Sequence, residues 1–328
     1  MLPKRGREPA SPLGRLAQLS YTQGMSESPA LWPVSRPVLR YYGGGWSRAA
    51  WTISHFPSHS VYCEPFMGSG SILLRKQPSK LEIANDIDGR LMAFFRVLRE
   101  RPDELIQAIR LSPWHEGEYL LSLQRADEEL EEARRFFLSC WASIQGGPAP
   151  GPADFRWQKK ETRRSPAPQD IIRLEHLLQA AERLKRVQFL QRDGLDLIRK
   201  MRATGALLYV DAPYLAETRK RLDGYRHEAG DREWHEELAT LLLQHEGPAL
   251  IAGYRSSLYE QLYEQAGWSR VEREQQANSG KRAIECLWLS PILQSQKARE
   301  TERQESGKAA PLPSWQMGLL IQDDPTAL

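Results

Sequence analysis

The sequence predicts an α/β fold built on an open, doubly wound sheet, with helices on both faces of mostly parallel strands. Two stretches carry this prediction. A short strand, a glycine turn and the start of a helix follow one another from Val61 to Lys76, which is the entry to a doubly wound sheet. A second apolar strand, Leu207–Val210, stops at Asp211. Because helices cover both faces of such a sheet, a polar strand end opens onto a ligand crevice.

The amino-acid composition argues against a membrane-spanning, secreted or disulfide-rich protein. The chain has 328 residues, of which 41% are hydrophobic, and a net charge of only +3, so any nucleic-acid footprint must be local. No stretch is apolar for long enough to span a membrane, and the N-terminus lacks a secretory segment, so we expect a cytoplasmic protein. The isolated cysteines Cys63, Cys140 and Cys286 argue against a disulfide frame or a zinc site and predict buried thiols.

Both ends of the chain are rich in polar and charged residues. Prolines and charges of mixed sign occupy residues 1–37 without a period, which indicates a disordered arm with order beginning near Val38. From Gln294 onward the sequence is polar again, so residues 293–328 are predicted to be a tail.

Three features near the first strand suit an adenosine that carries an amino-acid tail. Glycines at 43–45 lie between aromatic residues and would let the backbone approach a ligand closely. Glu64 precedes the glycine turn, where an acid would repel a pyrophosphate but accept a cationic amino-acid group. Asp86 follows the predicted strand Leu81–Ala84, where a carboxylate can accept hydrogen bonds from ribose hydroxyls. Each feature alone is also compatible with a plain turn.

The turn after the strand Leu207–Val210 combines groups that suit a planar base bearing an amino group. Asp211 offers a carboxylate that only accepts hydrogen bonds, Ala212 a backbone carbonyl and Tyr214 a flat ring, while Pro213 fixes the backbone. A strand that simply runs into a turn would have the same residues, so the upstream features decide between the two interpretations.

Between the two halves of the predicted sheet the sequence changes to helical spacing. Pro102–Leu123 and Asp127–Trp141 place apolar residues on one face, and Ile171–Arg186 is a further helix before the strand Val187–Leu190. In residues 155–164, basic side chains interleave with aromatics, which suits phosphates and an unstacked base. A solvated charged surface would have a similar composition.

The remaining elements complete the predicted sheet. We expect helices at Asp231–Gln244 and Ser257–Ala266, and strands at Ala249–Ala252, Ser269–Gln276 and Ile284–Leu289.

In this order the motifs resemble the DNA adenine methyltransferases of the Dam-like type, in particular the short phage and prophage members. The matching pieces run over about residues 38 to 292 and are Tyr-Gly-Gly-Gly-Trp (42–46), Glu-Pro-Phe-Met-Gly-Ser-Gly-Ser (64–71), Asn-Asp-Ile-Asp (85–88), Gln-Arg-Asp (191–193), Asp-Ala-Pro-Tyr (211–214), Tyr-Arg-His-Glu (225–228) and Cys-Leu-Trp-Leu-Ser-Pro (286–291). The resemblance implies a seven-stranded, Rossmann-like methyltransferase core that binds S-adenosyl-L-methionine and methylates the amino group of a flipped adenine in double-stranded DNA without a metal.

The resemblance divides the chain and its site residues by role. It implies a core at residues 38–112 and 187–292, with a small, mainly helical target-recognition region inserted at 113–186. Residues implied to hold the target base are Asp211, Ala212, Pro213 and Tyr214. Residues implied to bind the cofactor, with Asp193 facing its adenine, are Tyr41, Tyr42, Trp46, Glu64, Pro65, Phe66, Gly68, Gly70, Asp86, Asp193 and Asp211. Residues expected to bind DNA are Arg156, Trp157, Lys159, Lys160, Arg163, Arg164, Tyr225, Arg226 and His227.

His227 is also a candidate general base. An adenine amino group needs no prior deprotonation when acceptors localise its lone pair, so a capping or DNA-contacting role fits His227 better.

Two positions depart from the family's pattern. Where the family has a lysine after two glycines, this chain has Gly45 followed by an aromatic, and Arg40 or Arg48 is a candidate substitute. The family's Asp-Pro-Pro-Tyr is Asp-Ala-Pro-Tyr here, which loses rigidity but keeps the carbonyl of Ala212.

Two alternatives therefore stay open. One is an amino-group methyltransferase that acts on RNA adenine or protein glutamine, and the other is a DNA-binding relic with weakened catalysis. For the main hypothesis we expect a monomer near the nucleoid of a bacterial or phage-infected cell, with or without a partner in restriction-modification.

Overall fold

The computed structural model describes residues 31–144, 146–147, 154–157, 167–215, 231–276 and 282–306. Among these residues no helix is both long and apolar enough to cross a membrane. The same part of the chain contains no group of three or more His, Cys, Asp or Glu side chains that could hold a metal ion.

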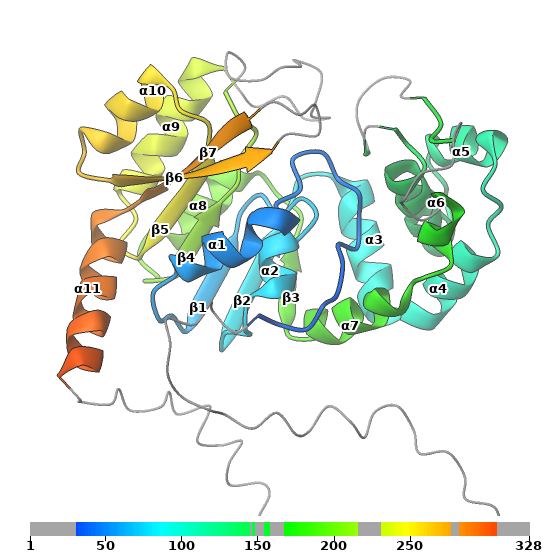
Figure 1. Cartoon of the computed structure of the whole chain (residues 1–328), viewed down its shortest axis with the longest axis horizontal. Coiled ribbons are helices and arrows are strands. Elements are labelled where there is room, and N and C mark those ends of the chain that lie inside the picture. The colour runs from blue at the N-terminus through cyan, green and yellow to red at the C-terminus, as the bar shows by residue number, and fades with distance from the viewer. Residues whose placement is uncertain are drawn as a thin grey trace, which may run out of the picture.

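Seven strands form one sheet in the order β3-β2-β1-β4-β5-β7-β6 (Figure 1). The strands are β1 (Val61–Glu64), β2 (Leu81–Asn85), β3 (Val187–Leu190), β4 (Leu207–Val210), β5 (Ala249–Gly253), β6 (Ser269–Gln276) and β7 (Arg282–Leu289). The first five pair in parallel, and β7 pairs antiparallel with both β5 and β6. The strand order reverses between β1 and β4, and ligands bind beyond the carboxyl ends of strands at such a reversal.

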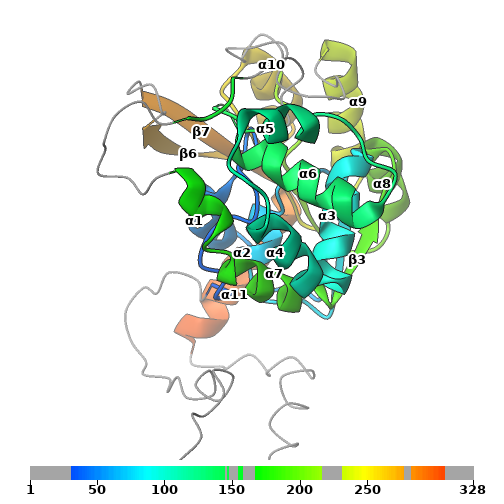
Figure 2. The ribbon, with the colours of Figure 1, turned by 90° about the vertical axis from the view of Figure 1, so that its right-hand side faces the viewer.

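Helices cover both faces of the sheet, which confirms the predicted doubly wound α/β fold (Figures 1 and 2). On one side lie α1, α2, α3 and α7, and on the other α8, α9 and α10. In chain order the helices are α1 (Ala49–Ser54), α2 (Ser71–Arg75), α3 (Gly89–Glu100), α4 (Pro102–Arg110), α5 (Glu116–Ser122), α6 (Glu129–Trp141), α7 (Glu175–Leu184), α8 (Gly194–Met201), α9 (Arg232–Leu243), α10 (Ser257–Tyr259) and α11 (Pro291–Glu305), with short turns η2 (Trp46–Arg48), η3 (Ala167–Ile171) and η5 (Glu260–Glu264).

Strand β4 shows why these short apolar runs form buried strands. All four of its residues are buried. Leu207 and Tyr209 pack into the core on the α1 side of the sheet, whereas Leu208 and Val210 pack into the core on the α9 side. Alternate side chains of a strand point to opposite faces, so a strand covered on both faces is apolar throughout.

The helices between β2 and β3 form a lobe that shares its core with the sheet (Figure 1, right). Phe94 of α3 stacks on Phe137 of α6 with 6.3 Å between ring centroids, and it also contacts Phe136. Each of these three rings is fully buried. The region predicted as an insertion at 113–186 is therefore packed directly onto α3.

Two sequence predictions about local structure were wrong. The predicted helix Pro102–Leu123 is two helices, because α4 ends at Arg110 and α5 begins at Glu116, with Pro113 between them. The structured part of the chain begins before Val38, because Trp32 already donates its backbone N–H to the carbonyl of Arg75 at 2.7 Å. Residues 1–30 lie outside the described part of the chain.

The segment predicted to be a polar tail begins within helix α11. Ser290 caps this helix by accepting from the N–H of Leu293, and Pro291 occupies its first turn. Lys297 donates to the carbonyl of Ser54 at 2.5 Å, and Glu300 accepts from the N–H of Ser58 at 2.8 Å. Capping and polar tethers thus hold a helix that lacks an apolar stripe.

Candidate active site

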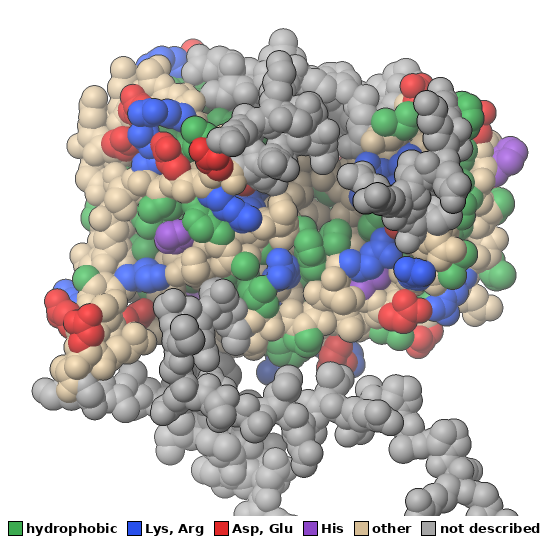
Figure 3. All heavy atoms as spheres, viewed as in Figure 1, with side chains coloured by type: hydrophobic (Ala, Val, Ile, Leu, Met, Phe, Trp, Pro, Cys, Tyr) green, Lys and Arg blue, Asp and Glu red, His purple; other side chains and the backbone are tan. Residues whose placement is uncertain are grey.

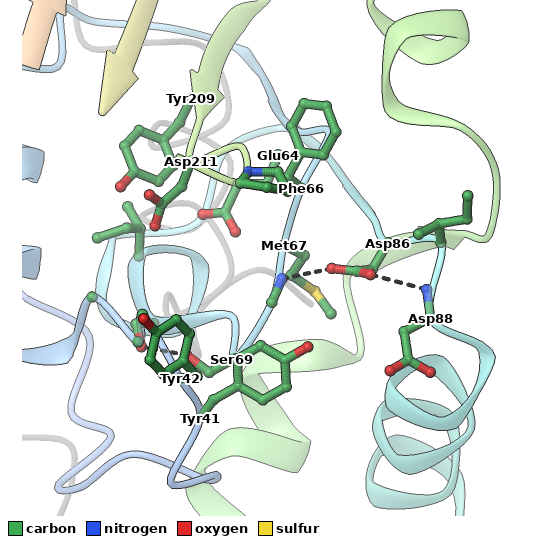
Figure 4. Close-up of a pocket in the computed structure, with 18 residues that line it drawn as sticks. Tyr41, Tyr42, Glu64, Phe66, Met67, Ser69, Asp86, Asp88, Tyr209 and Asp211 are labelled. Carbon is green, nitrogen blue, oxygen red and sulfur yellow. Dashed lines mark hydrogen bonds between the residues drawn. The ribbon is translucent and has the colours of Figure 1, made fainter. Parts of the chain in front are cut away.

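A pocket lies at the carboxyl ends of β1, β2 and β4 (Figure 4). Its wall is made of the loop before η2, the turns after β1 and β2, and the end of β4. The lining residues are Tyr41, Tyr42, Gly43, Gly44, Gly45, Glu64, Phe66, Met67, Gly68, Ser69, Ser71, Ile72, Asp86, Ile87, Asp88, Tyr209, Asp211 and Pro213.

The glycine turn after β1 is held against the neighbouring strand. Met67 donates its N–H to the carbonyl of Asn85 at 2.8 Å, and the Asn85 side chain donates to the carbonyl of Pro65 at 2.9 Å. Gly68 and Gly70 have φ of 50° and 63°, a region that residues with a Cβ rarely adopt. The glycines are therefore required by the turn that shapes the pocket floor.

Asp86 is oriented by two backbone hydrogen bonds (Figure 4). Its Oδ2 accepts from the N–H of Gly68 at 2.9 Å, and its Oδ1 accepts from the N–H of Asp88 at 3.0 Å. Both carboxylate oxygens are thereby fixed in orientation at the edge of the pocket. The bonds also tie the end of β2 to the glycine turn.

Glu64 and Asp211 lie together on one side of the pocket, and Asp86 lies on the other (Figure 4). Glu64 is buried and accepts a hydrogen bond from the hydroxyl of Tyr62. Burial raises the pKa of the Glu64 carboxyl to about 8; the Tyr62 hydrogen bond lowers it and the Asp211 carboxylate raises it further. A cationic ligand group would be stabilised beside these two acids.

Asp211 sits at the tip of β4 and is engaged by an arginine from the N-terminal part of the chain. Arg48 donates through one terminal nitrogen to Oδ2 of Asp211 and through the other to Glu285 of β7 at 3.2 Å. Only 4% of Arg48 is exposed. Three elements that are distant in sequence thus meet at the acid.

The aromatic residue of the same turn rests on the end of the next strand. The ring of Tyr214 meets the ring of Tyr254 edge to face, with 5.0 Å between centroids. Burial raises the pKa of the Tyr214 hydroxyl well above its usual value. Tyr214 is therefore a neutral, half-buried ring beside the pocket rather than one of its lining residues.

A comparison with known families identifies the family of this chain. The sequence model of the D12 class N6 adenine-specific DNA methyltransferases matches residues 41–277. The chain belongs to this family. The DNA adenine methylases of Escherichia coli (strain K12) and Salmonella typhi are similar to it, each with 32% identity over 76 residues. The match covers 23% of this chain and 27% of each relative, so the chain matches about a quarter of the length of these relatives.

The pocket of this D12-class chain brings together seven of the residues predicted to bind a cofactor, and four others lie outside its lining. Those that line it are Tyr41, Tyr42, Glu64, Phe66, Gly68, Asp86 and Asp211. Trp46 lies under the guanidinium of Arg75 at 5.1 Å, while Pro65 and Gly70 belong to the backbone of the glycine turn. Asp193 caps α8 by accepting from the N–H of Asp196 at 3.0 Å.

The predicted DNA-binding residues are only partly described in this family member. Arg156 pairs with Asp170 and lies over the ring of Trp114 at 5.2 Å, so it helps to build the helical lobe. Trp157 is 58% exposed. Lys159, Lys160, Arg163, Arg164, Tyr225, Arg226 and His227 lie outside the described residues. On the face seen in Figure 3, acidic and basic side chains of the described residues are interspersed.

Sequence reasoning did not name several residues that line the pocket. Met67 and Ser69 lie inside the motif at 64–71, and Ile87 lies inside the motif at 85–88. Ile72 follows the first motif by one position, in helix α2. Arg48 was named only as a candidate substitute for the missing lysine. Its partners lie 163 and 237 positions away, and a single sequence has no signal for such contacts.

Proposed function

We propose that this chain transfers the methyl group of S-adenosyl-L-methionine to the N6 amino group of adenine in double-stranded DNA. The observation that carries the proposal is the pairing of two unlike sites at one sheet edge: a pocket lined by Glu64 and Asp86, and the acid Asp211 at its rim. The family match over residues 41–277 supports the same activity.

The lining residues fit the proposed cofactor by the chemistry of their groups. Asp86 accepts the ribose hydroxyls, and Glu64 faces the cationic amino-acid tail. Gly44 lines the pocket, and a side chain there would crowd the loop because its Cβ would lie 3.0 Å from the carbonyl oxygen of Tyr41. When bound, the cofactor supplies a methyl group activated by a sulfonium.

The target adenine takes the place next to Asp211. Its amino hydrogens bond the Asp211 carboxylate and the carbonyl of Ala212, which directs the nitrogen lone pair toward the methyl carbon. The N–C bond forms as the S–C bond breaks, and the amino group then releases one proton to solvent. Tyr214 provides the ring on which the base stacks after it has flipped out of the duplex.

The surface that reads the DNA is assigned to the helical lobe. Trp157 is exposed there, and it begins a basic run that ends at Arg164. Cations in such a run contact phosphates, and aromatics contact unstacked bases. This assignment makes residues 113–186 the target-recognition region of the proposed enzyme.

Transfer of a labelled methyl group to DNA, RNA and protein pools tests the substrate class. We expect label in duplex DNA as N6-methyladenine, and sequencing of DNA from expressing cells to show one modified sequence. Label in RNA or protein instead would favour the alternative amino-group methyltransferase. Cofactor binding with no transfer to any pool would favour the DNA-binding relic, for which Gly45 and Ala212 are the motivating features.

A further inference from the structure

Arg48 is a buried cation that the proposed reaction does not yet use. Its side chain is 5% exposed and bonds two acids at once, Asp211 at the end of β4 and Glu285 on β7. The planar guanidinium presents its donors in a fixed fork. A cation in this place therefore fixes the orientation of both carboxylates.

The hydrogen bonding of Arg48 is incomplete within the described residues. Its two terminal nitrogens donate to the acids, whereas its Nε, although buried, has no hydrogen-bond partner among the described residues. An unsatisfied buried donor is unfavourable for stability. The two acids are therefore the charged groups that hold the guanidinium in place.

Gly45 stands where the family has a lysine, and it lies directly against the guanidinium of Arg48. A Cβ at Gly45 would lie 3.1 Å from Nε of Arg48 and 3.3 Å from its central carbon, which is closer than ordinary van der Waals contact. The space that a side chain at 45 would need is thus taken by Arg48. In this chain the positive charge beside Asp211 comes from Arg48.

We propose that Arg48 is a positioning residue for the methyl-transfer step, and that Glu285 holds it in place. By bonding Oδ2 of Asp211, Arg48 presents Oδ1 to the amino group of the target adenine. This inference rests on the proposed function, and it adds a second role to the site: orienting the acid that orients the base.

Single-turnover methylation with saturating DNA and cofactor tests the inference. Arg48→Gln should lower the methyl-transfer rate at least about tenfold, because an Asp211 carboxylate that rotates freely orients the amino group of adenine less well. Cofactor affinity, measured by calorimetry, should change by less than about threefold, since Arg48 does not line the pocket. Arg273→Gln is the matched control: it removes an arginine bond to Ser47, the neighbour of Arg48, but not a contact to Asp211.

A double-mutant cycle separates positioning from a general structural effect. If Arg48 acts through Asp211, then Arg48→Gln should add little to the defect of Asp211→Asn, so the double variant should be within about threefold of Asp211→Asn alone. Independent, multiplying defects would overturn the inference. If Arg48→Gln does not fold, the same cycle is run with Glu285→Gln, which loosens the guanidinium and should slow transfer without changing cofactor affinity.

Introducing the family's lysine at position 45 provides a second test of the inference. Gly45→Lys should not raise cofactor affinity and should slow transfer, because it crowds the guanidinium of Arg48. Tighter cofactor binding at an unchanged rate would show that Arg48 does not occupy the lysine's place. A wild-type chain that methylates no DNA adenine overturns the proposed function, whereas an active wild type with an equally active, folded Arg48→Gln overturns only the role of Arg48.

Discussion

At the residue scale, Asp86 holds the glycine turn and is proposed to bind the cofactor, and two substitutions of Asp86 test the second role. Asp86→Ala removes the acceptor for a ribose hydroxyl, so cofactor binding should weaken by roughly 1.5 to 3 kcal/mol, the range for a hydrogen bond to a charged group. Asp86→Asn keeps one oxygen that can accept from the N–H of either Gly68 or Asp88, and it should lose less. Calorimetric titration measures both; unchanged affinity in Asp86→Ala would remove Asp86 from the cofactor site.

The raised pKa of Glu64 predicts a pH dependence of cofactor binding. Because this pKa is about 8 without a ligand, the carboxyl keeps its proton below that pH. A cation beside it favours the ionised form, so binding releases a proton, and affinity should rise as the pH increases toward about 8. Calorimetry in two buffers of different ionisation enthalpy counts the protons. Glu64→Gln should abolish this release, and an unchanged release would assign it to another group.

Single residues differ in how far the sequence predicts them. Glu64, Asp86 and Asp211 were predicted because each follows a strand, and strand ends meet at one edge of a parallel sheet. Asp193 follows a strand as well, but its carboxylate caps a helix, a use that the same residue type serves equally well. Arg48 could not be placed because its contacts depend on the complete fold.

At the scale of elements, the turn after β4 joins the acid to the ring of Tyr214. Tyr214→Ala should cost the flipped base roughly 1 to 3 kcal/mol of stacking, and a mismatch opposite the target adenine should partly relieve the defect because flipping becomes easier. Methylation rates on matched and mismatched duplexes measure this relief. Tyr214→Phe is the control and should retain much of the activity, while a defect indifferent to the mismatch would exclude stacking on this ring.

Strands whose residues are all buried could be predicted from the sequence, whereas a helix that depends on its capping residue could not. The apolar run of β4 identified a strand because both faces of the sheet are covered. Helix α11 depends on the cap at Ser290 and on polar tethers, so a search for apolar periodicity did not find it. Pro113 ended a helix that apolar spacing alone had extended.

At the scale of the whole molecule, the shared core predicts that the helical lobe and the sheet unfold together. Phe94 is fully buried and packs against rings of α6. Phe94→Ala should therefore destabilise the protein by about 3 to 5 kcal/mol, and chemical unfolding should remain a single transition by fluorescence and by circular dichroism. Two separated transitions would mean that the lobe is an independent domain.

The central claim is that the acid at the tip of β4 holds the adenine amino group during methyl transfer. Asp211→Asn tests it most directly, because asparagine has nearly the same shape but a neutral oxygen. Measured by single turnover on duplex DNA, the variant should keep DNA binding and slow methyl transfer by about 100-fold or more, as for the loss of a preorganised electrostatic contact. Transfer at the wild-type rate by Asp211→Asn would contradict the account.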